Sequence, residues 1–373
     1  MRAWLLCGVL LLLFSLPVAA EGADDVYGQL LEESGAGSLT QALPEDVQAL
    51  LEQWELDGLS PDTYTDLSLM RVGELAMDLL RNESAAPRGA FGVLLGVILL
   101  TALLSGLEVG TATPLRDAYH GVAVLGAGGL LLTPLFGLVE AVGETARQVT
   151  VFLTAYVPAY AGILVTGGSP VGALSYQTTL LGATQALTLL IGQVVFPVLT
   201  VSLALGCTGA VVEGFCLESI SQTLHKTVLW ALGLFSTVFS GVLSLQQMVA
   251  GAGDSLSGRV IKFSLSGLVP VVGGMLSEAY ATVAGGVGLL RTTVGGFGLL
   301  VVVLTVTPPL LRCVCWSLCL SVGAAVSSLF GLSPLEKLCR VAGGTVRVLV
   351  AVLAVFALLM VVATLAVSSV SGR

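Results

Sequence analysis

The sequence predicts an all-α polytopic membrane protein, on the strength of three observations. Of the 373 residues, 55% are hydrophobic and only 10% are charged, whereas soluble domains average about 25% charged residues. Apolar runs of about twenty residues recur from Gly89 onward, each long enough to cross a bilayer core of about 30 Å. Because backbone amides must be paired internally within lipid, we expect these runs to be helices.

The N-terminal part predicts a leader followed by an acidic exported region. Residues 1–20 combine a charged start, an apolar core shorter than a span and small residues before Glu21, which is typical of a secretory signal peptide. An uncleaved anchor is the alternative, and both place residues 21–88 outside the cytoplasm. This small region holds fifteen Asp and Glu against three Arg. Helical spacing of apolar residues after Pro44, and a second helix start at Ser60-Pro61, predict two amphipathic helices there.

The membrane part predicts about eight transmembrane helices. The spans are expected near 89–107, 119–139, 150–167, 178–206, 226–248, 264–283, 292–312 and 345–369. The segment 313–331 is ambiguous, because it could extend the seventh span, lie in the interface or form a hairpin. Glu140, Glu144 and Arg147 are expected on a short amphipathic connector between two spans. With the acidic region outside, eight spans would leave the C-terminus outside as well.

An internal repeat is expected within this membrane part. A shift of 112 positions brings Val157-Pro158 onto Val269-Pro270 and Phe196-Pro197 onto Pro308-Pro309. Two three-helix repeats would then occupy residues 108–219 and 220–331, and the odd number of spans would invert one repeat relative to the other. The first span (89–107) precedes the repeats, and a partial repeat with the last span (332–373) follows them.

Prolines and glycines interrupt several of the expected spans. Proline within a helix removes a backbone hydrogen bond and favours a kink, and glycine lets backbones approach closely. Either these residues pack kinked helices tightly, or the broken helices line a path or binding site at mid-membrane. The candidate path-lining or helix-break residues are Pro158, Gly162, Pro197, Pro270, Gly273, Gly274 and Pro309, and Lys262 and Glu278 are candidate interfacial charges.

No enzyme signature is evident. Gly251-Ala-Gly-Asp254 resembles the glycine-aspartate signature of intramembrane aspartyl proteases, but we expect it in a loop without a second aspartate nearby. There is no HExxH zinc motif and no phosphate-binding loop, and Cys313, Cys315 and Cys319 have no histidine or carboxylate close by to complete a metal site. We therefore expect no catalysis and no cofactor. The acidic balance gives no support to nucleic-acid binding.

Two sequence blocks carry a family resemblance. Residues 227–246 (TVLWALGLFSTVFSGVLSLQ) and 260–279 (VIKFSLSGLVPVVGGMLSEA), placed after a leader and a helical exported region, closely resemble the stage III sporulation protein AE family. The resemblance runs from about residue 90 to the C-terminus. The exported region matches only in length and character.

The resemblance implies a location and a set of partners. Members are multi-pass proteins of the mother-cell membrane around the engulfed forespore, so residues 21–88 would face the intermembrane space. The implied function is that of a membrane subunit of a transenvelope, secretion-like channel complex, with a permease-like element as one option. The implied partners are other membrane proteins of the complex, including ring-forming subunits, and a secretion-type ATPase. A stand-alone secondary transporter and a passive scaffold are the alternatives.

Overall fold

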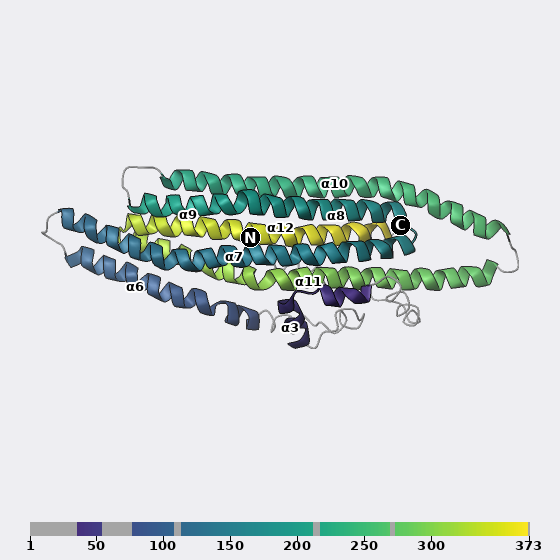
Figure 1. Ribbon diagram of the computed structural model, residues 1–373, viewed down its shortest axis with the longest axis horizontal. Helices are drawn as coiled ribbons and strands as arrows, with labels where there is room; N and C mark the ends of the chain where they lie inside the picture. The colour runs from purple at the N-terminus through teal and green to yellow at the C-terminus, as the bar shows by residue number, and fades with distance from the viewer. Residues whose placement is uncertain (1–35, 54–76, 108–112, 212–216, 269–272, 372–373) are drawn as a thin grey trace.

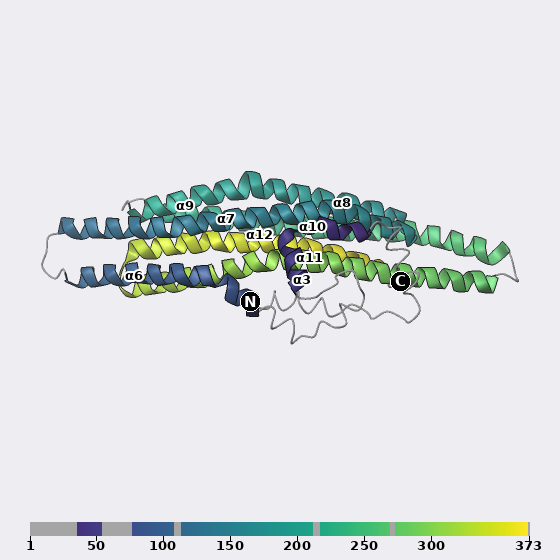
Figure 2. The same ribbon diagram turned by 60° about the horizontal axis from the view of Figure 1, so that its bottom comes forward.

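The described part of the chain forms one elongated bundle of long helices. The computed structural model describes residues 36–53, 77–107, 113–211, 217–268 and 273–371, and all regular structure within them is helical. Figures 1 and 2 show the long helices running nearly parallel to one axis, with α12 between the others. The all-α prediction is confirmed, including for the described residues of the acidic region.

The elements follow one another as a series of hairpins. Two short elements, η1 and α3, lie against the side of the bundle, with η1 on α7 and α3 on α11. In chain order the elements are η1 (Ala36–Ala42), α3 (Glu45–Gln53), α6 (Ala85–Leu107), α7 (Thr113–Thr166), α8 (Pro170–Leu190), the π-helical turn η2 (Ile191–Val195), α9 (Phe196–Val211), α10 (Leu217–Leu268), α11 (Gly273–Leu329) and α12 (Ser333–Ser371).

Several helices are far longer than one bilayer crossing. α7 has 54 residues, α10 has 52 and α11 has 57, so each is about 80 Å long at 1.5 Å per residue. Within the described residues, six helices are long and apolar enough to span a membrane. The eight separate spans expected from the sequence are therefore not confirmed, since the expected spans at 119–139 and 150–167 both lie in α7.

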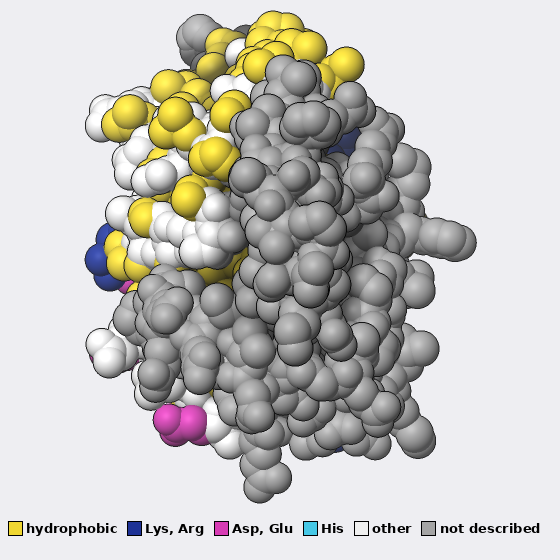
Figure 3. All heavy atoms as spheres, turned by 90° about the vertical axis from the view of Figure 1, so that its right-hand side faces the viewer, with side chains coloured by type: hydrophobic (Ala, Val, Ile, Leu, Met, Phe, Trp, Pro, Cys, Tyr) yellow, Lys and Arg dark blue, Asp and Glu magenta, His cyan; other side chains and the backbone are white. Residues whose placement is uncertain are grey.

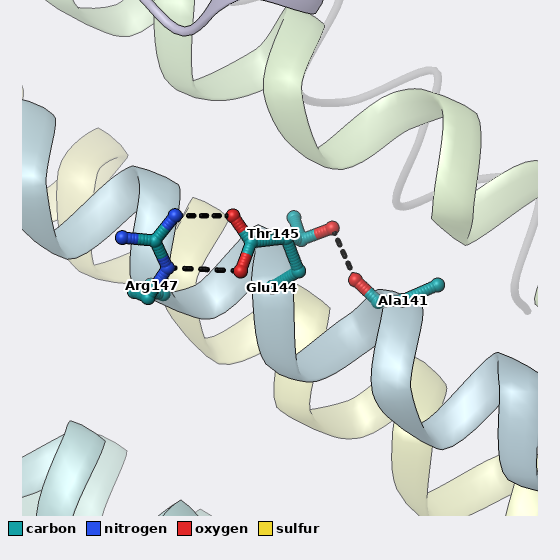
Figure 4. A network of polar contacts seen from close by, with 4 residues as sticks. All are labelled: Ala141, Glu144, Thr145 and Arg147. Atoms are coloured by element: carbon teal, nitrogen blue, oxygen red, sulfur yellow. Dashed lines mark hydrogen bonds and ion pairs between the residues drawn. The ribbon is translucent and has the colours of Figure 1, made fainter.

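The charged segment that was expected to separate those two spans is part of the helix. Glu and Arg are good helix formers, and Glu144 and Arg147 lie one turn apart, where Arg147 donates two hydrogen bonds of 2.8 and 2.6 Å to the carboxylate (Figure 4). The prediction of a connector at 140–147 was wrong. The charged residues end an apolar run of the sequence, but the helix continues through them. For the ambiguous segment 313–331, the structure shows the first option: residues 313–329 extend α11.

Two glycines end long helices in the same manner. Gly168 (φ +80°) follows α7, and Gly331 (φ +69°) follows α11. In both turns the glycine N–H donates to a carbonyl three residues back, and the next residue's N–H donates five residues back, which is the Schellman pattern. Pro170 and Pro334 then occupy the first turns of the next helices, where no backbone N–H is needed.

The expected three-helix repeat is not confirmed by these elements. Between residues 113 and 329 the chain forms an antiparallel pair of α7 with α8–α9, followed by α10 and α11, which both pack against α12. Pro158 lies inside α7, whereas Pro270 falls in the connection between α10 and α11, outside the described residues. The inverted repeat stays a prediction.

Candidate functional site: buried polar groups in the bundle

An aromatic ladder lies along the buried face of α7. Phe152, Tyr156 and Tyr160 recur every four residues, so their rings stack on one helix face, with centroids 5.5 Å apart at each step. Tyr176 of α8 continues the series, 5.3 Å from Tyr160. All four side chains are buried. The ladder therefore places three phenolic hydroxyls inside an otherwise apolar bundle.

Two glycines of α11 make room for this ladder. A Cβ atom built on Gly298 would overlap the ring of Tyr156 and lie 2.7 Å from the Met360 Cε atom of α12, and one built on Gly295 would lie 3.2 Å from the Tyr160 hydroxyl. Glycine at these positions lets the helix backbone touch the ring faces. The close contact between α7, α11 and α12 therefore requires glycine at positions 295 and 298.

Arg291 closes the end of the ladder. Its guanidinium Nη2 donates to the carbonyl of Leu164 at 3.2 Å, and its own carbonyl accepts from the Tyr160 hydroxyl at 3.4 Å. Leu164 lies in the last turn of α7, where the helix dipole favours a cation. Arg291 therefore fixes the α7–α8 turn against α11.

A second buried polar cluster joins α9, α10 and α12. The Nε2 atom of His225 lies 2.9 Å from the Ser202 hydroxyl and 3.3 Å from the Thr345 hydroxyl, and Ser202 lies 2.5 Å from the hydroxyl of Ser221. Each of these four side chains is at least 95% buried. Because each of the four side chains has a hydrogen-bond partner within the cluster, the cluster can hold three helices together.

The His225 cluster was not expected from the sequence. Ser221 lies one turn before His225 on α10, so this spacing was a readable signal. Ser202 and Thr345 come from other helices, and nothing in the sequence ties them to His225. The cluster is closed to solvent and holds no carboxylate, so it suits helix packing better than nucleophilic catalysis.

Four of the residues predicted to line a path have described side chains or surroundings, and they lie on three different helices. Pro158 and Pro197 are exposed on α7 and α9, Pro309 is half-buried within α11, and Gly162 is half-buried with no atom near its Cβ direction. α7 and α11 continue through their prolines, while Pro197 follows the π-helical turn η2, which accommodates its missing N–H.

The remaining candidate residues come from the segment around the connection between α10 and α11. Pro270 lies outside the described residues. Lys262 lies in α10, and Gly273, Gly274 and Glu278 lie in the first turns of α11, where the structure describes the backbone only. Their role in lining a path stays a prediction.

The interior between α7, α9 and α12 is nearly filled. A cavity of about 10 Å³ is lined by Leu131, Leu135, Leu203, Cys207 and Ala342, among others, which is room for a single water molecule. Within the described residues, no group of three or more His, Cys, Asp or Glu side chains is arranged to hold a metal ion.

Comparison with known proteins gives one consistent family. The family model described as stage III sporulation protein AE matches residues 63–372. Stage III sporulation protein AE of Bacillus subtilis (strain 168) is 24% identical over 346 residues, which cover 89% of this chain and 79% of that protein. No solved structure matches. Because the match spans every long helix of the bundle, the chain belongs to the stage III sporulation protein AE family.

Proposed function

We propose that this protein is a membrane subunit of the transenvelope channel complex that links mother cell and forespore during endospore formation. The observation that carries the proposal is the family match, which extends from residue 63 through the end of the helical bundle. The six candidate spans support a multi-pass protein. The proposed location is the mother-cell membrane around the forespore, with the acidic N-terminal region in the intermembrane space.

The proposed partners are the other membrane proteins of that complex, its ring-forming subunits and its secretion-type ATPase. A deletion of the gene in its own host tests membership. We expect loss of late forespore gene expression, and restoration by a tagged copy that co-purifies with other subunits of the complex. Normal late expression in the deletion strain, or a functional tagged copy that purifies alone, would contradict the proposal.

Within the complex, a permease-like role and a scaffold role make different predictions. The hydroxyls of Tyr156, Tyr160 and Tyr176 favour the permease-like role, because polar side chains gathered inside a membrane protein often mark a substrate path. The nearly filled interior between α7, α9 and α12 favours the scaffold.

Tyr160→Phe separates the two roles, since it removes one hydroxyl and keeps the ring that packs on Gly295. A permease-like element would lose late forespore expression while the complex still co-purifies. A scaffold would lose neither. Solute uptake by the purified protein alone in liposomes would instead support a stand-alone transporter.

A further inference from the structure

Charged side chains from five different segments gather at one level of the bundle. We call this level the charged belt and define it by Glu83, Glu140, Glu144, Arg147, Lys226, Arg312 and Arg347. Glu83 binds Arg312 at 2.7 Å. Lys226 follows His225, whose partner Thr345 lies two residues before Arg347. Counting about 1.5 Å per residue from the contacts between helices places the belt within a layer about 12 Å thick.

On one side of the belt, five helices are free of charge for about the thickness of a bilayer core. From Arg147 to the turn at Gly167 is 20 residues, and from Arg312 back to Arg291 is 21, so both stretches are about 30 Å long. α10 and α12 carry no charged residue from 227 to 253 and from 348 to 372. Together with α8, these segments form what we call the clear section.

The outer surface of the clear section is apolar. Leu174 and Leu189 on α8, and Val238 and Leu245 on α10, are each more than half exposed. Figure 3 looks along the bundle from this end, and hydrophobic side chains cover much of the described surface in view. Trp230, which is 69% exposed, lies one turn from Lys226, as expected for an aromatic residue at a membrane interface.

The other side of the belt does not suit a bilayer. Glu218 on α10 lies eight residues before Lys226, and Glu336, Lys337 and Arg340 on α12 lie seven to eleven residues before Arg347. These four charges would be about 10–16 Å deep, near the centre of a bilayer that began at the belt. A charge there costs roughly 2.5–3.5 kcal/mol on insertion scales. The clear section has no such cost.

A single bilayer cannot cover both sides of the belt. The two charge-free stretches of α7 follow one another along the same helix, and together they are longer than one bilayer core is thick. Figures 1 and 2 show the hairpin of α6 and the first half of α7 projecting past the other helices at the end opposite to the clear section. The choice therefore lies between a section in which all five helices are free of charge and a section in which α10 and α12 carry four charges beside uncharged stretches of α6, α7, α9 and α11.

We propose that the bilayer surrounds the clear section alone, so that α7, α8, α10, α11 and α12 each cross it once. The belt then lies at the membrane surface on the side of the N-terminal region. One contact supports that side: Glu83, which precedes α6, pairs with Arg312. The hairpin of α6 and α7 stands on the same side, and the C-terminus lies on the opposite side.

This placement differs from an eight-span fold at four positions, one of which is Arg291, expected on the N-terminal side in the eight-span fold and on the opposite side here. The α6–α7 and α11–α12 connections lie on the N-terminal side here and on the other side in the eight-span fold, while the C-terminus is reversed. Both arrangements put the α7–α8 turn opposite to the N-terminal region. Lys337 and Arg340 fall on the exported side, against the positive-inside tendency, so the α11–α12 connection is the most informative position.

Cysteine labelling of the full-length chain in the membrane of a bacterial host tests the proposal. All native cysteines are replaced, and single cysteines are introduced as Glu52→Cys, Thr113→Cys, Ser169→Cys or Ser333→Cys, with a C-terminal epitope tag. We expect an impermeant maleimide to label positions 52, 113 and 333 in intact cells, and position 169 and the tag to become accessible only after permeabilisation. Protection of position 113 or 333 in intact cells, or exposure of the tag, would overturn the five-crossing arrangement.

Discussion

The guanidinium of Arg312 binds the carboxylate of Glu83 through Nε and Nη2, each 2.7 Å from Oε2. The two residues are 229 positions apart in the chain. This contact ties the segment before α6 to the middle of α11, so it anchors the N-terminal region at the belt. It also explains why a charge lies in the middle of a 57-residue apolar helix.

Replacement of Glu83 by Gln should loosen this anchor. Because the Arg312 side chain is 41% exposed, we expect a loss of only about 1 kcal/mol in the free energy of unfolding. The measurement is the midpoint of unfolding in detergent, together with the rate of protease cleavage before residue 84. Asp78→Asn is the matched control, since the Asp78–Arg81 pair is 3.8 Å apart and both side chains are about three-quarters exposed. Equal effects of the two substitutions would rule out the anchor.

Gly298→Ala should disrupt the three-helix contact at the ladder. The added methyl group overlaps the Tyr156 ring, and overpacking of this kind costs roughly 1–3 kcal/mol. Gly288→Ala, on the same helix with no atom within 4 Å of its Cβ position, should cost nothing measurable. Thermal unfolding in detergent compares them. The combination with Tyr156→Leu should recover part of the loss, and no recovery would place the strain elsewhere.

Ser202→Ala should destabilise the bundle through His225. The imidazole keeps only the longer contact to Thr345, and Ser221 loses its partner, so we expect a loss of roughly 1–3 kcal/mol. Thr237→Ala on exposed α10 surface, where the hydroxyl bonds only to its own helix, serves as the control. The measurement is the midpoint of thermal unfolding in detergent. Equal midpoints for Ser202→Ala and Thr237→Ala would show that the cluster contributes little to stability.

Spin labels should report different surroundings on the two sides of the belt. In a nanodisc, a label at Val238 of the clear section should collide more with oxygen, which concentrates in lipid, than with a polar nickel complex. A label at Val122 on the hairpin, 70% exposed, should show the reverse preference. Oxygen preference at both sites would mean that the hairpin also enters the bilayer.

The sequence predicts the class of this fold well and its connectivity less well. Hydropathy and composition identify an all-helical membrane protein, and Pro44 with the following apolar spacing identifies α3. Hydropathy fails at Glu140–Arg147, because a charged turn ends an apolar run without ending a helix. The Gly168-Ser169-Pro170 and Gly331 turns were readable from local sequence, since glycine and proline there have specific backbone roles.

The buried polar groups could not be located from the sequence for a different reason. Tyr156, Gly298 and Met360 meet although more than sixty positions separate each from the next, and His225 meets Ser202 and Thr345 across three helices. Periodicity along one helix shows which residues share a face, but it does not show which other helix covers that face. The path-lining prediction relied on proline as a break, whereas α7 and α11 absorb Pro158 and Pro309 within continuous helices.

The central position of α12 has a consequence for biosynthesis. It packs against α7, α9, α10 and α11, and it supplies Thr345 to the histidine cluster and Met360 to the ladder. Among the described helices it is the last to leave the ribosome. Until it arrives, the earlier helices enclose an unfilled centre with incompletely paired polar groups, so a chain stopped before residue 333 cannot reach the native packing. The packing of the bundle is therefore completed only when α12 is in place.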